Sequence, residues 1–278
     1  MPKLYYGHVM SGDVKIHYYR TGDEKPSVVL LHGITDSGLC WNQMALHLEP
    51  EYDVVMVDAR GHGLSDAPGG GYTAGEMAED VVVLIRQLAL DRPVVIGHSI
   101  GAEMAAVIAA RYPQLVSGVV LEDPPWYEPS FLPSESERRQ RAEDLRQSIL
   151  EMHAKGLEEL LATARQKYPN GDGGDHFHWA RAKQQAHPEV AQKFLEAPRP
   201  WMELIQQFGC PVLLVTGDPT LGALVTAEVA AQVERTWKNG KVVHLPGAGH
   251  SIHRTQFEPF YRTVLDFLKQ RNWKAKKG

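Results

Sequence analysis

The chain has 278 residues, of which 43% are hydrophobic and 23% are charged, and its formal net charge is −5. This length and composition are typical of one large globular α/β domain with room for an insertion. The slight acidity gives no reason to expect nucleic acid or an anionic membrane as a partner, and no stretch has the apolar length of a transmembrane helix.

The cysteines and the N-terminus indicate a reducing compartment. Cys40 and Cys210 lie far apart and in no metal-binding spacing, so we expect free thiols. Residues 1–8 lack the charged segment and apolar run of a secretory signal. These features predict a cytoplasmic protein. They leave the oligomeric state open, with a homodimer as one alternative.

The first half of the sequence alternates between segments typical of strands and of helices. Residues 4–20 alternate around a Ser-Gly-Asp turn, which predicts an antiparallel hairpin. Four short runs are continuously apolar, as in strands covered on both faces, and apolar residues recur at helical spacing between them. This pattern predicts a mostly parallel sheet with helices on both faces. The expected strands are 28–31, 53–58, 94–96 and 116–121, and the expected helices include 40–48 and 77–88.

The most specific motif follows the run at 94–96. Gly97-His98-Ser99-Ile100-Gly101 is a Gly-x-Ser-x-Gly sequence, and Ala- and Met-rich helical sequence follows directly. A strand, a sharp turn with a serine at its tip and a helix together form a nucleophile elbow. Side chains in place of the two glycines would collide with a neighbouring strand or helix, and the turn strains the backbone. We therefore predict that Ser99 is a nucleophile.

The alternation stops between about residues 126 and 207, where the sequence is charged and helical. Ser134 and Glu137 form a capping box that opens a long helix, and another helix is expected over 176–186. A helical insertion of this size predicts a lid over the carboxyl ends of the strands. The core domain is then residues 1–125 and 208–278, with further strands at 211–218 and 241–245 and helices at about 226–237 and 256–271.

A serine is a weak nucleophile unless a base removes its proton as it attacks. The chain has 13 histidines, and His250 follows the last expected strand in the sequence Pro-Gly-Ala-Gly-His. That position brings it to the same edge of the sheet as Ser99, and its small neighbours allow close approach. We predict that His250 is the base. His32 and His98 also lie near the elbow and are expected to brace it through hydrogen bonds.

These motifs resemble those of the α/β-hydrolase superfamily, in the family's order and over nearly the whole chain outside the insertion. The matching segments are His32-Gly33, Asp58-x-Arg60-Gly61-His62-Gly63-x-Ser65, Gly97-x-Ser99-x-Gly101 and Gly247-x-Gly249-His250. The resemblance implies an eight-stranded, mostly parallel sheet with helices on both faces and a helical cap. It also implies an oxyanion hole formed by the backbone N–H groups of Ile34 and Ile100. No metal or organic cofactor is implied.

The carboxylate that orients His250 has several candidates. In many relatives it follows the seventh strand, a few residues after a glycine, and here Asp218 comes directly after such a glycine. Other members, among them haloalkane dehalogenases and certain lactonases, carry it after the sixth strand, where this chain has Asp123 before two prolines. We favour Asp123, because a carboxylate at a strand end opposite the elbow can hold and stabilise the imidazolium. Asp218 is the alternative and otherwise a turn residue, and Glu122, which alternation points the other way, is a third candidate.

Two polar clusters have a structural interpretation. Residues 58–63 form a structural loop in the family that this chain resembles. His176 and His178 are two residues apart on an expected helix, so they do not share a face, and they predict no metal site.

Three tryptophans, Trp126, Trp179 and Trp201, lie in or beside the expected lid. We expect most of them to pack within it. Trp126, which closely follows Asp123, is the one predicted to line the substrate pocket. An aromatic lid and a nearly neutral chain favour a small, rather apolar substrate.

Together these features predict a serine hydrolase of esters or lactones. Ser99 would attack the carbonyl with His250 as base, and an acyl-enzyme would then be hydrolysed. A serine at the elbow argues against haloalkane dehalogenase or epoxide hydrolase chemistry, for which the family uses an aspartate. The same triad also permits hydrolysis of amide or carbon–carbon bonds. Two further alternatives are a cofactor-free haloperoxidase or perhydrolase, which the intact lid disfavours, and a ligand-binding protein with slow turnover.

Overall fold

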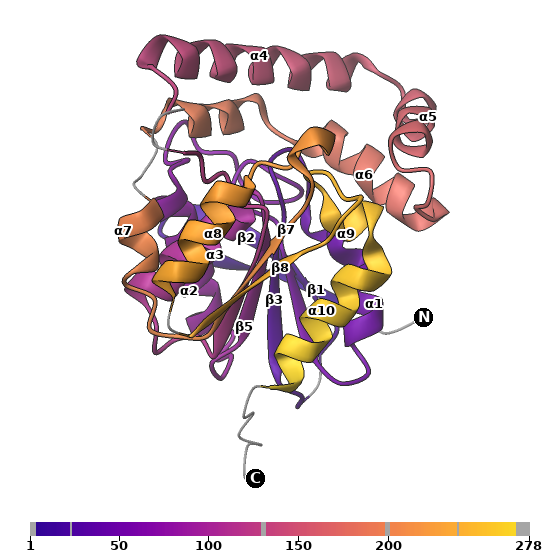
Figure 1. The fold of residues 1–278 in the computed structure, drawn as a ribbon. Coiled ribbons are helices and arrows are strands. Elements are labelled where there is room, and N and C mark those ends of the chain that lie inside the picture. The colour runs from indigo at the N-terminus through magenta and orange to yellow at the C-terminus, as the bar shows by residue number, and fades with distance from the viewer. Residues whose placement is uncertain (1–3, 23, 129–131, 198–200, 238, 271–278) are drawn as a thin grey trace.

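The centre of the molecule is a twisted eight-stranded sheet in the order β1-β2-β4-β3-β5-β6-β7-β8 (Figure 1). The computed structural model describes residues 4–22, 24–128, 132–197, 201–237 and 239–270. β1 pairs antiparallel with β2, β2 pairs antiparallel with β4, and all the other neighbours are parallel. The sheet is therefore mostly parallel, as expected. The strands are β1 Tyr5–Ser11, β2 Val14–Arg20, β3 Ser27–Leu31, β4 Asp53–Val57, β5 Val94–His98, β6 Gly118–Glu122, β7 Val212–Thr216 and β8 Gly240–His244.

Helices cover both faces of this sheet. Every residue of the five strands from β3 to β7 is buried, which explains why their sequences are continuously apolar. One hydrophobic cluster lies under α2, α3 and α8, and a second lies under α1 and α10 on the opposite face. The covering helices are α1 Asn42–Leu48, α2 Ala74–Gln87, α3 Ile100–Arg111, α8 Ala227–Thr236 and α10 Phe257–Lys269, with short helical turns at η1 Gly38–Trp41, η4 Pro219–Leu221 and α9 Ile252–Thr255.

The helical insertion between β6 and β7 arches over the carboxyl ends of the strands (Figure 1). It has its own small core, in which Tyr168 and Trp179 pack against Leu160. Its last helix behaves differently, because Trp201 and Ile205 of α7 belong to the main core beside α3. Helix α7 thus packs on the main core, whereas α5 and α6 form the separate core of the insertion. The elements of the insertion are α4 Glu135–Ala154, α5 Leu157–Lys167, α6 Gly173–Gln185 and the 3-10 helix η3 Pro188–Leu195, and they are followed by α7 Trp201–Ile205.

Within the described residues no helix combines the length and apolar character that crossing a membrane requires.

Candidate active site

Ser99 occupies a strained turn between β5 and α3. Its backbone has φ 54° and ψ −118°, a conformation that costs about 1–3 kcal/mol for a residue with a side chain. The flanking glycines leave room for it. A Cβ at Gly97 would lie 2.1 Å from the carbonyl oxygen of Gly101, and a Cβ at Gly101 would lie 2.3 Å from the carbonyl oxygen of Leu31. The helix thus packs directly against the end of the sheet and presents Ser99 at its N-terminus.

His250 contacts Asp123 across the edge of the sheet. The Nδ1–H of His250 donates a hydrogen bond of 2.6 Å to Oδ2 of Asp123. Asp123 is fully buried, and its two oxygens also accept hydrogen bonds from the backbone N–H groups of Leu224 and Val225, at 2.8 and 3.0 Å. These three donors hold the carboxylate in place and fix the orientation of the imidazole.

The other two candidate carboxylates are engaged elsewhere. Asp218 accepts a hydrogen bond of 2.6 Å from the N–H of Gly247 and pairs with His244 at 3.0 Å. Glu122 accepts two hydrogen bonds from His253, one from its backbone N–H and one from its ring. Of the three candidates, Asp123 is therefore the one that the structure brings to the imidazole predicted as the base.

His98, next to the serine, braces the loop that carries His250. Its Nε2–H donates to the carbonyl oxygen of His250 at 2.9 Å. Burial lowers the pKa of His98 to about 3, so the ring is neutral and carries its proton on the nitrogen that donates. This agrees with the expected bracing role.

The two N–H groups predicted for the oxyanion hole lie at the same place. Ile34 and Ile100 both line a cavity with Ser99, and within the described part of the chain no acceptor is recorded for either N–H. The N–H of Ile100 is free because it belongs to the first residue of α3, where a helix has no internal acceptor. Unpaired donors at this point can stabilise a developing oxyanion.

A pair of neutral histidines holds the loop that contains Ile34. Nε2 of His62 accepts from the N–H of Thr35 at 3.3 Å, and Nε2 of His32 accepts from the N–H of Ala59 at 3.1 Å. The two rings pack edge to face with their centroids 4.8 Å apart. Burial lowers the pKa of both, that of His62 to about 3. Their role is to position the loop.

The segment 58–63 is structural, in agreement with the expectation from sequence. Asp58 is fully buried and accepts hydrogen bonds from the N–H groups of Gly38 and Leu64, at 2.7 and 2.9 Å. Arg60 forms a two-pronged ion pair with Asp80, with both contacts at 2.7 Å. These contacts connect the end of β4 to α2 and to the loop before α1.

One group of three residues with metal-binding side chains occurs among the described residues, and it is not the pair His176 and His178. It consists of His98, Glu122 and His253, whose ligand atoms lie within 4.8 Å of one another. The hydrogen bonds from His98 to the His250 carbonyl and from His253 to Glu122 account for this cluster without an ion. His176 instead contacts the carbonyl oxygen of Tyr168 at 2.8 Å.

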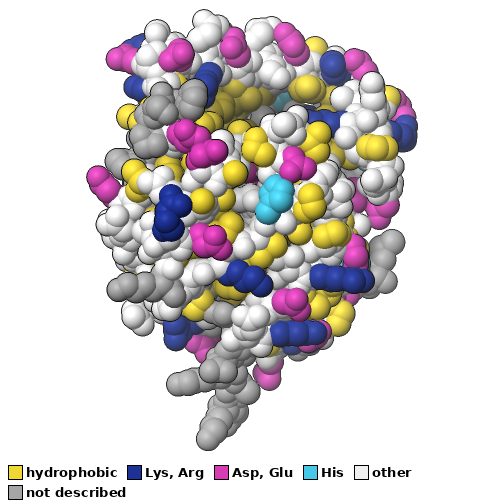
Figure 2. Space-filling view, viewed as in Figure 1, with side chains coloured by type: hydrophobic (Ala, Val, Ile, Leu, Met, Phe, Trp, Pro, Cys, Tyr) yellow, Lys and Arg dark blue, Asp and Glu magenta, His cyan; other side chains and the backbone are white. Residues whose placement is uncertain are grey.

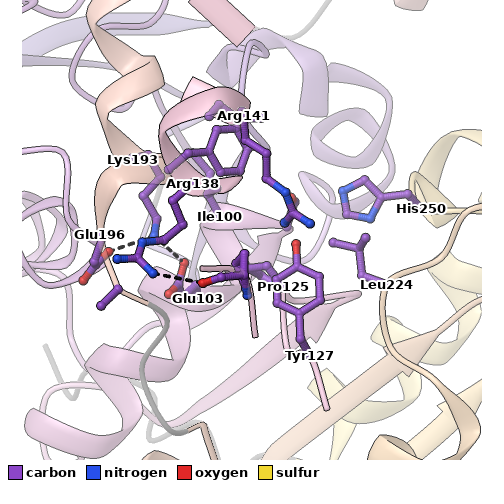
Figure 3. Close-up of a pocket in the computed structure, with 15 residues that line it drawn as sticks. Ile100, Glu103, Pro125, Tyr127, Arg138, Arg141, Lys193, Glu196, Leu224 and His250 are labelled. Atoms are coloured by element: carbon purple, nitrogen blue, oxygen red, sulfur yellow. Dashed lines mark hydrogen bonds and ion pairs between the residues drawn. The ribbon is translucent and has the colours of Figure 1, made fainter. Parts of the chain in front are cut away.

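Two cavities meet at Ser99 and His250, and both are also lined by Ile34. The first, of about 240 Å³, is lined near the serine by Ile100 and Leu224. Arg138 and Arg141 of α4 form its outer wall (Figure 3). The second, of about 260 Å³, extends beneath α5 and α6 and is more polar. The space-filling view shows an opening below the cap, with hydrophobic side chains at its floor (Figure 2).

Trp126 lies outside both of these cavities. It is 2% exposed and stacks on Trp201 of α7, with ring centroids 5.5 Å apart. Its neighbours Pro125 and Tyr127 line the first cavity instead. The N–H of Trp126 donates to the carbonyl oxygen of Pro124 at 2.7 Å, so the chain turns at Pro125, and no signal in the sequence favours Tyr127 over Trp126. The sequence also does not identify Arg138 and Arg141 as lining residues, because they are two of nine charged residues among the 20 of α4.

The comparisons with known proteins agree with this architecture. Residues 26–255 match the family model of the alpha/beta hydrolase fold, and the chain belongs to that family. It is 30% identical to 2-(acetamidomethylene)succinate hydrolase of Mesorhizobium japonicum over 252 residues, which are 87% of this chain and 88% of that protein. It is 25% identical to N-formylmaleamate deformylase of Pseudomonas putida, over 94% and 96% of the two chains. A crystal structure of E-2-(acetamidomethylene)succinate hydrolase superimposes with a TM-score of 0.77 and 25% identity, covering 96% of this chain and all of the other.

Proposed function

We propose that the protein is a serine hydrolase that cleaves a carboxylic ester or lactone of a small substrate through an acyl-enzyme. The observation that supports this most directly is the hydrogen bond of 2.6 Å between His250 and Asp123, at an edge where Ser99 lines the same cavity as His250. The reaction class follows from the side chains and the free N–H groups that meet there.

In this proposal His250 removes the proton of Ser99 through Nε2 while the serine oxygen attacks the carbonyl carbon. The tetrahedral oxyanion accepts hydrogen bonds from the N–H groups of Ile34 and Ile100, each worth about 3–4 kcal/mol in the transition state. His250 then gives its proton to the leaving oxygen, and the alcohol departs. A water molecule, deprotonated by the same imidazole, attacks the acyl-enzyme and releases the acid. Asp123 stays ionised throughout and stabilises the imidazolium.

A second candidate is hydrolysis of an amide by the same residues. It is favoured by the names of two relatives, one a hydrolase of 2-(acetamidomethylene)succinate and the other a deformylase of N-formylmaleamate. In that case His250 protonates a leaving nitrogen instead of an oxygen. Rates with a matched ester and amide of the same acid distinguish these two candidates.

The test uses Ser99→Ala and a fluorophosphonate probe that labels activated serines. The wild-type protein should be labelled and should hydrolyse short p-nitrophenyl esters with an initial burst of p-nitrophenol. Ser99→Ala should lose the labelling and nearly all of the turnover, while its circular dichroism spectrum stays that of the wild type. Labelling that persists in Ser99→Ala would show that another residue is the nucleophile.

A further inference from the structure

The second cavity at Ser99 is lined by an excess of cations. Lys167, Lys183 and Arg254 line it, and Asp36 is the one carboxylate among the lining residues that the structure describes. Ser99 and His250 form one wall of the same space. A small cavity with walls of one charge sign concentrates ligands of the opposite sign.

Lys183 can contribute only its positive charge to a ligand in this cavity, because all three of its hydrogen-bond donors are already used. Its Nζ donates to the carbonyl and hydroxyl oxygens of Thr35, at 3.0 and 2.8 Å, and to Oδ1 of Asp36 at 2.7 Å. The ammonium group of α6 is therefore fixed against the loop that follows β3. It has no further proton to offer a ligand.

Arg254 of α9 is different, because most of its donors remain available. Its Nη2 donates to Oδ2 of Asp36 at 3.0 Å, and no other acceptor for its guanidinium is recorded among the residues that the structure describes. The side chain is 10% exposed and its guanidinium carbon lies 5.3 Å from the centre of the Tyr168 ring. The contacts with Asp36 and Tyr168 fix the guanidinium. Its remaining N–H groups lie in one plane and can therefore donate to both oxygens of a carboxylate.

The positive charge of Arg254 is only partly balanced by carboxylates that line the cavity. Burial acts to raise the pKa of Asp36, but the charges of Arg254 and Lys183 outweigh it and hold that pKa well below its usual range. One carboxylate thus serves two buried cations. Asp175 and Glu122 also feel the charge of Arg254, but neither lines the cavity, and Glu122 accepts both hydrogen bonds of His253.

We propose that the substrate carries a carboxylate, which binds in the second cavity and accepts hydrogen bonds from Arg254 while the scissile carbonyl lies against Ser99. This inference rests on the proposed function and narrows its substrate to small anionic acids or their esters. A cavity of about 260 Å³ places the carboxylate only a few bonds from the carbonyl. The expectation of a rather apolar substrate fits the first cavity better than the second.

The experiment compares two pairs of esters of matched shape. Monomethyl succinate and methyl butyrate differ by a terminal carboxylate in the acyl part, and acetoxyacetate and propyl acetate differ by one in the leaving group. The wild-type protein should prefer the anionic member of at least one pair in kcat/KM. In Arg254→Gln that preference should fall about 10- to 100-fold, the range expected for losing a charge-assisted hydrogen bond. Using a ratio cancels any general loss of activity in the variant.

Two further variants separate local recognition from general electrostatics and from misfolding. Arg141→Gln removes the same charge from the other cavity and should change the ratio less than Arg254→Gln does. Lys167→Gln removes an exposed cation from the second cavity with little risk to folding, and it should lower the ratio by about three- to tenfold. The inference is overturned if the wild type shows no preference in either pair, or if the ratio in folded Arg254→Gln equals that of the wild type. Either result would mean that the ion pairs of Asp36 with Lys183 and Arg254 serve only to hold the cap on the core.

Binding to Ser99→Ala tests the carboxylate site without catalysis. Calorimetry should show that the anionic member of at least one pair binds at least about tenfold more tightly than the neutral member, and the double variant Ser99→Ala/Arg254→Gln should lose this difference. If the wild type hydrolyses no ester in either pair but this binding difference is present, the proposed reaction is wrong and the carboxylate site stands. Equal binding of the two members in both pairs overturns the site.

Discussion

Replacing Asp123 by asparagine tests how the fold prepares His250. Three N–H donors, from Leu224, Val225 and His250, point at the two oxygens of this fully buried side chain. An amide has a single oxygen, so its NH₂ group must face at least one of these donors. Where the NH₂ group takes the place of Oδ2, it donates to Nδ1 of His250, and the imidazole adopts its other tautomer, in which Nε2 carries the proton. That tautomer cannot take the proton of Ser99.

We expect Asp123→Asn to lower kcat by about 10,000-fold, the loss that the wrong histidine tautomer causes in a serine protease triad. This corresponds to about 5.5 kcal/mol in the activation free energy. The free energy of unfolding should fall by only about 1–3 kcal/mol, the cost of one unsatisfied buried group. Because the two losses differ, kcat measured on protein shown to be folded by circular dichroism distinguishes a catalytic effect from unfolding.

Asp218→Asn is the matched control for this substitution. Asp218 is partly exposed and contacts Gly247 and His244 but not His250, so we expect less than about a fivefold change in kcat. Steady-state rates with a p-nitrophenyl ester at pH 8 measure both variants. A loss in Asp218→Asn as large as that in Asp123→Asn would refute the reasoning, because it would place the orienting carboxylate after β7.

Two further predictions concern stability. The free energy of unfolding should fall by roughly 3 kcal/mol between pH 6.5 and pH 5.5. The pKa values of four buried histidines are lowered in the folded state, so these side chains take up protons only on unfolding, and each costs about 1 kcal/mol of stability over this interval; they are His32, His62, His98 and His253. The raised pKa of Glu122 offsets a part of this loss. Urea unfolding over this pH range measures the change, and an unfolding free energy that stays constant contradicts it. Gly101→Ala should destabilise the fold by more than about 3 kcal/mol or prevent soluble expression, because its Cβ would lie 2.3 Å from the Leu31 oxygen. Gly173→Ala is the control: Gly173 has open space around it, so this substitution should change Tm little.

The sequence predicted the sheet and its covering helices well because those features depend on local patterns. The five strands from β3 to β7 are continuously apolar and buried on both faces, and Gly97 and Gly101 mark a turn that steric contact alone requires. The walls of the cavities could not be predicted in the same way. In α4 only Ile149 is buried, so its pattern does not show which face meets the core. The directions of Arg138 and Arg141 depend on how the cap docks, which is a property of the tertiary structure.

The end of the predicted insertion illustrates the same limit. Charged, helical sequence continues to residue 207, and nothing in its composition separates α7 from the cap helices. In the structure Trp201 of α7 stacks on Trp126 and belongs to the core beside α3. The pair of tryptophans explains two features that the sequence does not predict, because the stacking that holds Trp126 outside the two cavities also holds α7 against the core.

The register of the sheet explains why a carboxylate after β6 can reach the histidine beside the elbow. His98 and Glu122 are paired residues at the ends of the parallel neighbours β5 and β6, and the N–H of Ser99 donates to the carbonyl oxygen of Glu122 at 3.0 Å. Ser99 and Asp123 therefore leave the sheet at the same level, and both have a positive φ, 54° and 42°. The consecutive side chains of Glu122 and Asp123 have different partners: Glu122 contacts His253, and Asp123 contacts His250. The position of the acid thus follows from the pairing of two adjacent strands, and the loop after β7 contributes the N–H groups of Leu224 and Val225 that hold its carboxylate.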